Sequence, residues 1–379
     1  MTSASPSRAT GGGGDDGNDK DSGRVYRAVA AGESAEEVRR IIDQCARVDE
    51  QRRAAAVNWG IGEETPLRAA HRQRRGDLVG ALVEAGASVG GIFQGRLTPI
   101  AVCIAYGRVD SVRALLRNGH DPSEKIKWDP TYGFAGNGVI FCLPAHLCLA
   151  PALLDPSQQR VTRQVGCLEV LVDEGGVDVN AQDRCGETPL FWLAKHWLAK
   201  HCPADDAADA ASEEAAARLL LAAGARASSG LFNSDGCSPL MATAFYDNAR
   251  FARFLIEEAG APVDERSPPN GRTALYLCGI GGETETMAVP LEAGADIEAR
   301  YDHGGTPLRS CAGYCRSGPT QLLLDRGASA DVVDSKGLTP LIWACEQHPW
   351  FSDDQRWPVF QNLLPPLLCP DAARRQRSH

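Results

Sequence analysis

Hydrophobic and polar positions follow helical periods along this chain, and one short motif opens successive periods. Thr-Pro-Leu or a close variant begins at Thr65, Thr98, Thr273, Thr306 and Thr339. The steps between neighbouring motifs (98 − 65, 306 − 273 and 339 − 306) are 33 residues each. A constant period in this range is typical of a stacked repeat protein.

Each repeat predicts two short helices. The Thr hydroxyl can accept a hydrogen bond from an amide of the first turn, and the following Pro has no N–H group to leave unpaired, so the motif begins the first helix. Apolar pairs such as Leu82-Val83 and Leu323-Leu324 give the second helix a buried stripe. A glycine 21 residues after the Thr, as at Gly86 (86 − 65) and Gly294 (294 − 273), supplies the left-handed position that ends the second helix.

A turn-rich stretch connects one repeat to the next, as in residues 180–190, where Asp and Gly suit a tight hairpin. Degenerate motifs at Leu143, Thr188 and Ser238 extend the series. With these residues the chain resembles the ankyrin repeat family over nearly all of its length outside the tails. The resemblance implies an all-α fold, an α-solenoid of about nine helix-turn-helix repeats with β-hairpin connections.

Composition and repeat register divide the chain into three parts. Residues 1–23 are polar and rich in Gly, Ser and Asp, which predicts a disordered tail without a secretory signal. Residues 24–368 form the repeat domain, with an atypical first unit at 24–57 and an atypical last unit at 339–368, as solvent-facing caps require. Residues 369–379 form a basic C-terminal tail.

Three insertions and one proline depart from the repeat pattern. The insertions fall at 123–141, 151–164 and 197–212. The first lengthens a hairpin, and the other two lengthen loops between the helices of a repeat. Pro290 stands where other repeats carry Leu, and because an interior Pro removes a helical hydrogen bond, we expect a kinked or shortened second helix there.

Charge and motif content narrow the classes of function. The formal net charge of −10 disfavours nonspecific binding to nucleic acid or to an anionic membrane, because both require a positive field. The sequence contains no phosphate-binding loop, zinc-protease helix or hydrolase nucleophile elbow. We therefore expect no enzymatic activity, no cofactor, no nucleic acid and no membrane partner. The expected state is a monomer in the cytoplasm, or alternatively in the nucleus.

The cysteines fit the repeat register better than they fit a metal site. Cys103, Cys278 and Cys311 each lie five residues after their Thr, where other repeats carry Ala, so cysteine replaces a small core residue. Cys142 and Cys148 lie close to a histidine, but no Cys-x-x-Cys pair supports a tetrahedral zinc site. We expect no bound metal.

The resemblance implies that hairpin tips and first helices form a concave face that binds other proteins. The lengthened hairpin carries Trp128, Tyr132 and Phe134, which are candidate interface anchors. Alternatively, these aromatic side chains fold the insertion onto its own neighbours. The candidates at regular hairpin tips are charged or polar: Arg184, Asp302, His303 and Lys336.

We therefore predict a noncatalytic scaffold that binds a protein partner on its hairpin tips and concave helical face. The alternative is a substrate-recruiting adaptor subunit of an enzyme complex such as a ubiquitin ligase. That role requires a docking motif outside the repeats, and the candidate stretch follows Trp350. An enzyme hidden in the insertions is a third hypothesis.

Overall fold

The structure is a computed structural model that divides into two compact units, residues 1–126 and 127–379. It describes residues 16–47, 50–61, 64–73, 75–89, 98–123, 126–128, 140–142, 165–183, 185–196, 207–227, 230–268, 270–345 and 352–364.

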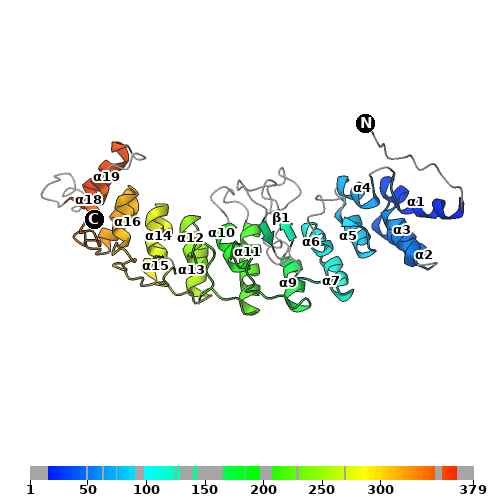
Figure 1. Cartoon of the computed structure of the whole chain (residues 1–379), viewed down its shortest axis with the longest axis horizontal. Helices are drawn as coiled ribbons and strands as arrows, with labels where there is room; N and C mark the ends of the chain where they lie inside the picture. Colours follow the sequence, from blue (N-terminus) through cyan, green and yellow to red (C-terminus); the bar gives the residue numbers. More distant parts are fainter. Residues whose placement is uncertain are drawn as a thin grey trace, which may run out of the picture. The chain divides into compact units, whose positions relative to one another are not determined.

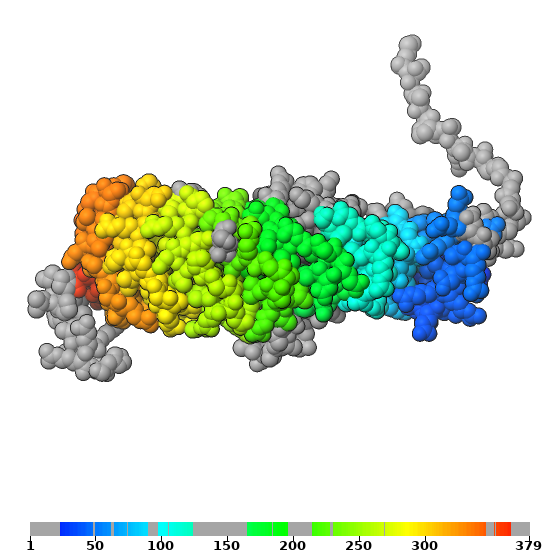
Figure 2. Space-filling model, turned by 90° about the horizontal axis from the view of Figure 1, so that it is seen from below, coloured from blue at the N-terminus to red at the C-terminus, as the bar shows by residue number. Residues whose placement is uncertain are grey.

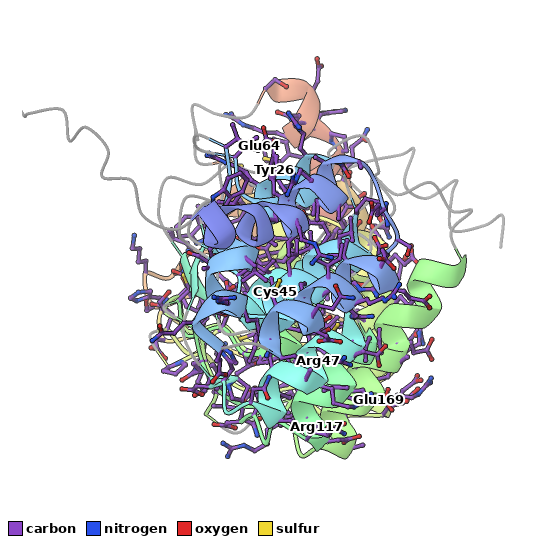
Figure 3. The ribbon with its side chains drawn as sticks, turned by 90° about the vertical axis from the view of Figure 1, so that its right-hand side faces the viewer. Tyr26, Cys45, Arg47, Glu64, Arg117 and Glu169 are labelled. Carbon is purple, nitrogen blue, oxygen red and sulfur yellow. The ribbon has the colours of Figure 1, made fainter. Side chains whose placement is uncertain are left out.

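Unit one is built from short helices that pack in pairs (Figure 1). They are α1 (Asp16–Ala30), α2 (Ala35–Ala46), α3 (Glu50–Asn58), α4 (Pro66–Arg72), α5 (Gly76–Glu84), α6 (Pro99–Ala105) and α7 (Val109–Arg117). The pairs α4–α5 and α6–α7 are regular repeats, whereas α1, α2 and α3 pack together as an end unit. Figure 3 looks onto this end and places Cys45 of α2 among the helices, in agreement with its 7% exposure.

The N-terminal end differs from the prediction in two ways. The polar tail was expected to reach residue 23, but α1 already begins at Asp16. In addition, the atypical first unit holds a third helix, α3, which lacks a Thr-Pro start and was not anticipated. The predicted helix pair itself is present. The Ser34 hydroxyl accepts a hydrogen bond from the Glu37 amide at 3.2 Å and so caps the start of α2.

Unit two continues the same architecture with a small sheet near its start. Strands β1 (Ile126–Trp128) and β2 (Ile140–Cys142) pair with each other at the two ends of the first insertion. The helices are α9 (Val165–Asp173), α10 (Pro189–His196), α11 (Ala207–Ala222), α12 (Pro239–Phe245), α13 (Ala249–Glu257), α14 (Ala274–Gly281), α15 (Thr284–Glu292), α16 (Pro307–Gly313), α17 (Ser317–Asp325), α18 (Pro340–Cys345) and α19 (Asp353–Leu363).

The helices of unit two form two layers. First helices α10, α12, α14, α16 and α18 pack side by side, and second helices such as α13, α15, α17 and α19 form the other layer (Figure 1). In the view from below, the repeats follow one another as bands of colour in sequence order (Figure 2). Repeated helix pairs joined by hairpins confirm the predicted fold class, an all-α repeat solenoid.

The predicted helix starts and ends are confirmed at the atomic level. The hydroxyl oxygens of Thr65 and Thr306 accept from amides three residues later, at 3.3 and 3.4 Å. Gly86 and Gly294 close the second helices with φ of +90° and +85°, a conformation that costs other residues free energy.

The core confirms the interpretation of three repeat cysteines. Cys103 and Cys311 are fully buried and Cys278 is 3% exposed. Each one packs as a small apolar side chain on a first helix. Cys148 and His146 of the considered metal site lie outside the described residues.

Several segments that the sequence predicts to be irregular contain regular helix in the structure. Helix α15 keeps nine residues with Pro290 inside it, as long as α5, α7, α13 and α17, so the expected shortening is wrong. Residues 207–212 of the third insertion are helical, because they begin α11; 197–206 lie outside the described residues. In the C-terminal unit, α19 continues through Pro358 for eleven residues. The second insertion, 151–164, is also outside the described part.

Candidate functional site

Three consecutive hairpin turns of unit two, 183–187, 233–237 and 267–272, lead into α10, α12 and α14. In each turn the amide of the first residue donates to the carbonyl of the last over 2.9 to 3.0 Å. Neighbouring turns are also linked, since the Ser234 amide donates to the Cys185 carbonyl at 2.7 Å. This bond joins the first two hairpins, and the third is joined to the following hairpin by the Asp302 amide, which donates to the Asn270 carbonyl at 3.0 Å.

A groove of about 400 Å³ lies between these hairpins and the first helices that follow them. Buried side chains, among them Phe191, Ala242 and Leu277, supply apolar walls. Its remaining lining is mostly polar or aromatic, contributed by the hairpins, by the C-terminal end of α12 and by Lys195 of α10. This groove is the candidate site, because it combines apolar walls with a few polar groups on a rigid frame.

One part of the groove contains a shielded ion pair. Lys195 Nζ donates to Glu187 Oε1 at 3.2 Å, and the Glu187 side chain is 8% exposed. Burial raises the pKa of Glu187, an effect that the charge of Lys195 offsets only in part. For Lys195, burial acts against the protonated form, but the charge and hydrogen bond of Glu187 outweigh burial and its pKa is raised. The two charges therefore neutralise each other, and the pair forms a fixed part of the groove wall.

Two aromatic side chains of α12 and its C-cap are exposed at the groove. Phe245 is 48% exposed and Tyr246 is 39% exposed, although both line the cavity. Large apolar side chains that remain accessible beside a groove are typical of interface anchors.

Arginine and aromatic side chains alternate from the groove toward the C-terminal repeats. The guanidinium of Arg272 lies 5.6 Å from the ring centre of Tyr276 and 6.0 Å from that of Tyr301. Arg309 lies 5.3 Å from the Tyr301 ring centre and 3.7 Å from that of Trp343. Arg309 Nη1 also donates a hydrogen bond to Tyr276 Oη at 3.2 Å. These five residues are called the cation–π ladder below.

The structure brings two of the predicted hairpin candidates to the cation–π ladder. The ring of His303 lies 5.4 Å from that of Tyr301, and Lys336 Nζ lies 5.7 Å from the ring centre of Trp343. Asp302 belongs to the same hairpin as His303, and its amide donates to the Asn270 carbonyl at 3.0 Å. None of these contacts identifies a partner, so all three remain candidates.

The other predicted candidates cannot be placed in the groove. Arg184, Tyr132 and Phe134 lie outside the described residues. Trp128 belongs to β1, but its side chain is not among those described.

Sequence reasoning did not select Arg272, Phe245 or Tyr246. The signal was present in the repeat register: Arg272 directly precedes its Thr, at the position where Glu187 stands in an earlier repeat. Tyr246 follows its Ser by eight residues, as Tyr314 follows its Thr. Aligning the repeats on the motif and searching for unusual side chains at these positions finds the groove residues.

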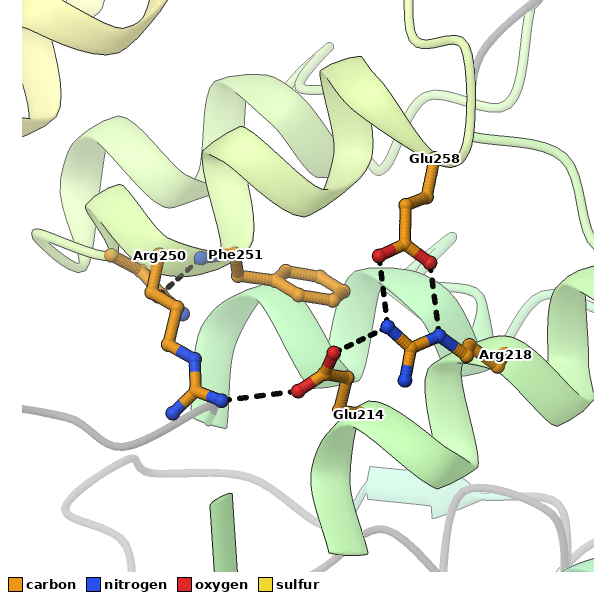
Figure 4. A network of polar contacts seen from close by, with 6 residues as sticks. Glu214, Arg218, Arg250, Phe251 and Glu258 are labelled. Carbon is orange, nitrogen blue, oxygen red and sulfur yellow. Dashed lines mark hydrogen bonds and ion pairs between the residues drawn. The ribbon is translucent and has the colours of Figure 1, made fainter. Parts of the chain in front are cut away.

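The second helices carry a separate network of charges (Figure 4). Glu214 and Arg218 of α11 reach across to α13: Arg218 pairs with Glu214 and with Glu258, and Arg250 pairs with Glu214 at 3.1 Å. All the charges in this network have partners within the protein. Its role is therefore to join neighbouring repeats, and exposed pairs of this kind contribute little to stability individually.

Two further features bear on function. Within the described ranges, no group of three or more His, Cys, Asp or Glu residues is arranged to hold a metal ion. Of the helices that the structure describes, none has the length and apolar character needed to cross a membrane.

The fold defines an all-α repeat protein whose helix pairs are joined by hairpins, and comparisons with known proteins agree. The family model for the ankyrin repeat matches residues 235–268. The ankyrin repeat domain of Bcl-3 superposes with a TM-score of 0.51 at 19% identity, over 70% of this chain and 98% of that chain, which supports the fold. The chain is an ankyrin repeat-containing protein, and this fold is a protein–protein interaction module.

Curated relatives share the repeats and are longer overall. Mitochondrial disaggregase of Bos taurus is 29% identical over 71% of this chain and 37% of its own length. E3 ubiquitin-protein ligase KEG of Arabidopsis thaliana is 26% identical over 35% of this chain and 8% of its own. Human ankyrin repeat and SOCS box protein 16 is 33% identical over 34% of this chain and 29% of its own. The match thus spans well under half the length of each of these relatives.

Proposed function

We propose that this protein is a scaffold that binds a protein partner in the groove of α10, α12 and α14. The observation that carries the proposal is the exposure of Phe245 and Tyr246, 48% and 39%, beside a groove of about 400 Å³. Hydrogen bonds within each hairpin hold this surface in shape before binding, so little conformational entropy is lost when a partner docks. Asp302, His303 and Lys336 extend the proposed surface along the next two hairpins.

Proximity labelling with matched variants tests the groove. The bait Phe245→Ser/Tyr246→Ser removes both exposed aromatic groups, and Trp357→Ser removes an aromatic group that is 58% exposed on α19, away from the groove. We expect the double variant to lose partners that the wild type and Trp357→Ser retain, with affinity reduced about tenfold or more. Equal capture by all three baits would contradict the groove as the binding surface.

The same experiment can include the lengthened hairpin. A Trp128→Ala/Tyr132→Ala bait asks whether the first insertion contributes anchors of its own. Loss of partners with this bait alone, and retention with the groove variant, would move the proposed surface from the groove to the insertion.

The adaptor hypothesis remains the second candidate because of the names of two relatives. One is an E3 ubiquitin-protein ligase and the other a SOCS box protein, and they match 35% and 34% of this chain. Copurification of ubiquitin ligase subunits with the full chain would favour the adaptor. Their absence from a preparation that retains the groove partner would favour the scaffold alone.

A further inference from the structure

Arg272 is held in place by the cation–π ladder, yet its charge is not neutralised. Two rings flank the guanidinium at 5.6 and 6.0 Å, and the side chain lines the groove. Among the residues that the structure describes, none accepts a hydrogen bond from this side chain, and its Nε is buried without a partner. Arg272 forms no ion pair with a described carboxylate and its side chain lines the groove, so a carboxylate from a partner can supply the counter-charge that the guanidinium lacks.

Arg309, in the following repeat, also lies against aromatic rings but has a carboxylate of the protein beside it. Its Nε likewise has no hydrogen-bond partner among the described residues, yet it lies 3.6 Å from Asp334 Oδ2 in an ion pair, and Nη1 donates to Tyr276 Oη at 3.2 Å. The ladder thus contains one arginine with an internal carboxylate and one without. The arginine without a carboxylate, Arg272, is the one that lines the groove, so a carboxylate can be added there by a partner.

The charges around the groove favour a single carboxylate over a more highly charged anion. Glu187 is already paired with Lys195, while Asp235 is exposed on the adjacent hairpin. With Arg272, the four charges of the groove sum to zero, so the groove has no excess positive charge of the kind that favours a dianionic phosphate. The planar guanidinium also suits the two oxygens of a carboxylate.

From these observations we infer that the groove recognises a partner segment in which an Asp or Glu side chain binds Arg272 and a neighbouring apolar side chain packs on Phe245 and Tyr246. This inference rests on the proposed function and specifies the chemistry of the partner. The acidic side chain supplies the acceptor that the guanidinium lacks, and the apolar side chain covers the exposed aromatic groups.

Peptide selection on the full chain tests the inference. The probe is a phage-displayed library of random twelve-residue peptides without cysteine, panned on wild type, Arg272→Glu, Arg272→Lys and Arg326→Glu. Arg326 is an exposed arginine at the end of α17, outside the groove, so it controls for the same change in net charge. Each variant is first checked for a wild-type circular dichroism spectrum and thermal midpoint.

We expect wild type and Arg326→Glu to enrich peptides with an acidic residue beside apolar residues. Arg272→Glu should lose the acidic preference and enrich Lys or Arg instead, whereas Arg272→Lys should keep the acidic preference. For one selected peptide, Arg272→Ala should weaken binding about 10- to 100-fold, as loss of a charged hydrogen-bond donor predicts.

Two results would overturn the inference and separate it from the proposed function. Enriched peptides without acidic residues, bound equally by wild type and Arg272→Glu, would refute the carboxylate site and leave the groove as a binding surface. If wild type enriches no peptide above an uncoated support, the groove does not recognise peptides, and both proposals fail.

Discussion

At the scale of single residues, two hairpins of unit two each contain an aspartate that also accepts a hydrogen bond from a tryptophan indole. Asp334 Oδ1 accepts from the amides of Lys336 and Leu338 at 2.8 and 3.0 Å, and its Oδ2 accepts from Trp343 Nε1 at 2.7 Å. Asp183 occupies the same register and accepts from Trp192 Nε1 at 3.2 Å. One carboxylate thus fixes both the turn and the first helix after it.

The Asp334 carboxylate predicts a pH dependence of stability. Burial raises its pKa, but hydrogen bonds from Leu338, Trp343 and Lys336 outweigh burial, so the pKa lies below the usual value. A group with a lowered pKa in the folded state stabilises fully above its unfolded pKa, near 3.9, and loses that contribution as pH falls through the folded pKa. We expect Asp334→Asn to cost about 1–2 kcal/mol at pH 7 and progressively less below pH 4.

Urea unfolding of wild type and Asp334→Asn between pH 2.5 and 7 measures this effect. Asp331→Asn is the matched control, because Asp331 is exposed and lies three residues before Asp334. A constant difference between wild type and Asp334→Asn across the whole range would contradict the assigned role.

The cysteines give a second prediction at the residue scale. Burial raises the pKa of Cys278 to about 12, and the thiolate is the reactive form, so this thiol should not react at pH 8 while the protein is folded. Cys345 is exposed and should react quickly with Ellman's reagent. We expect Cys345→Ser to remove one fast thiol and Cys278→Ser to leave the fast amplitude unchanged; a smaller fast amplitude in Cys278→Ser would show that its helix opens readily.

At the scale of helices, the sequence predicts where a helix begins and ends better than whether it is interrupted. Thr N-caps and left-handed glycines act locally, so spacing alone located α4, α6, α14 and α16. The expected shortening at Pro290 is wrong because packing overrides local propensity: Pro290 is buried, and α15 contacts α13 and α17. α3 lacks both landmarks, so nothing in the repeat register predicted it.

Pro290 also provides a prediction about α15. Replacing it with Ala restores the amide that an interior Pro lacks, worth about 3 kcal/mol in helical propensity, but removes some buried apolar surface. We expect Pro290→Ala to raise the free energy of unfolding by about 1–2 kcal/mol in urea titrations. Pro307→Ala is the control, because Pro307 occupies the first turn of α16, where proline is favourable. A comparable gain in both variants would contradict the explanation.

At the scale of the whole molecule, the fold followed from the repeat period, while the groove did not. A period identifies the residues that every repeat needs for folding, and the groove depends on those that differ, such as Arg272 and Tyr246. Their proximity arises because stacking places equivalent positions of adjacent repeats side by side, which local spacing does not display. Charged hairpin tips looked equivalent in the sequence, and the structure distinguishes those near the cation–π ladder, His303 and Lys336.

Stacking of repeats also determines how far the destabilising effect of a substitution extends through unit two. In a repeat array, stability is a sum of repeat terms and terms between neighbours, so the cost of a substitution depends on its place in the array. Phe251 of α13 is fully buried and stacks on Phe254, with ring centres 5.5 Å apart, and α13 contacts both α12 and α15. Val359 of α19 is equally buried but belongs to the last repeat.

Hydrogen exchange measured by mass spectrometry should separate the two substitutions. Phe251→Ala should cost about 3–5 kcal/mol and raise exchange in α12 to α15, because neighbours on both sides lose a packed surface. Val359→Ala should raise exchange in α17 to α19 and leave α12 and α13 protected, because only one neighbour is affected. If Val359→Ala raised exchange equally throughout unit two, the unit would unfold as one cooperative globule, and the additive description of its repeats would be wrong.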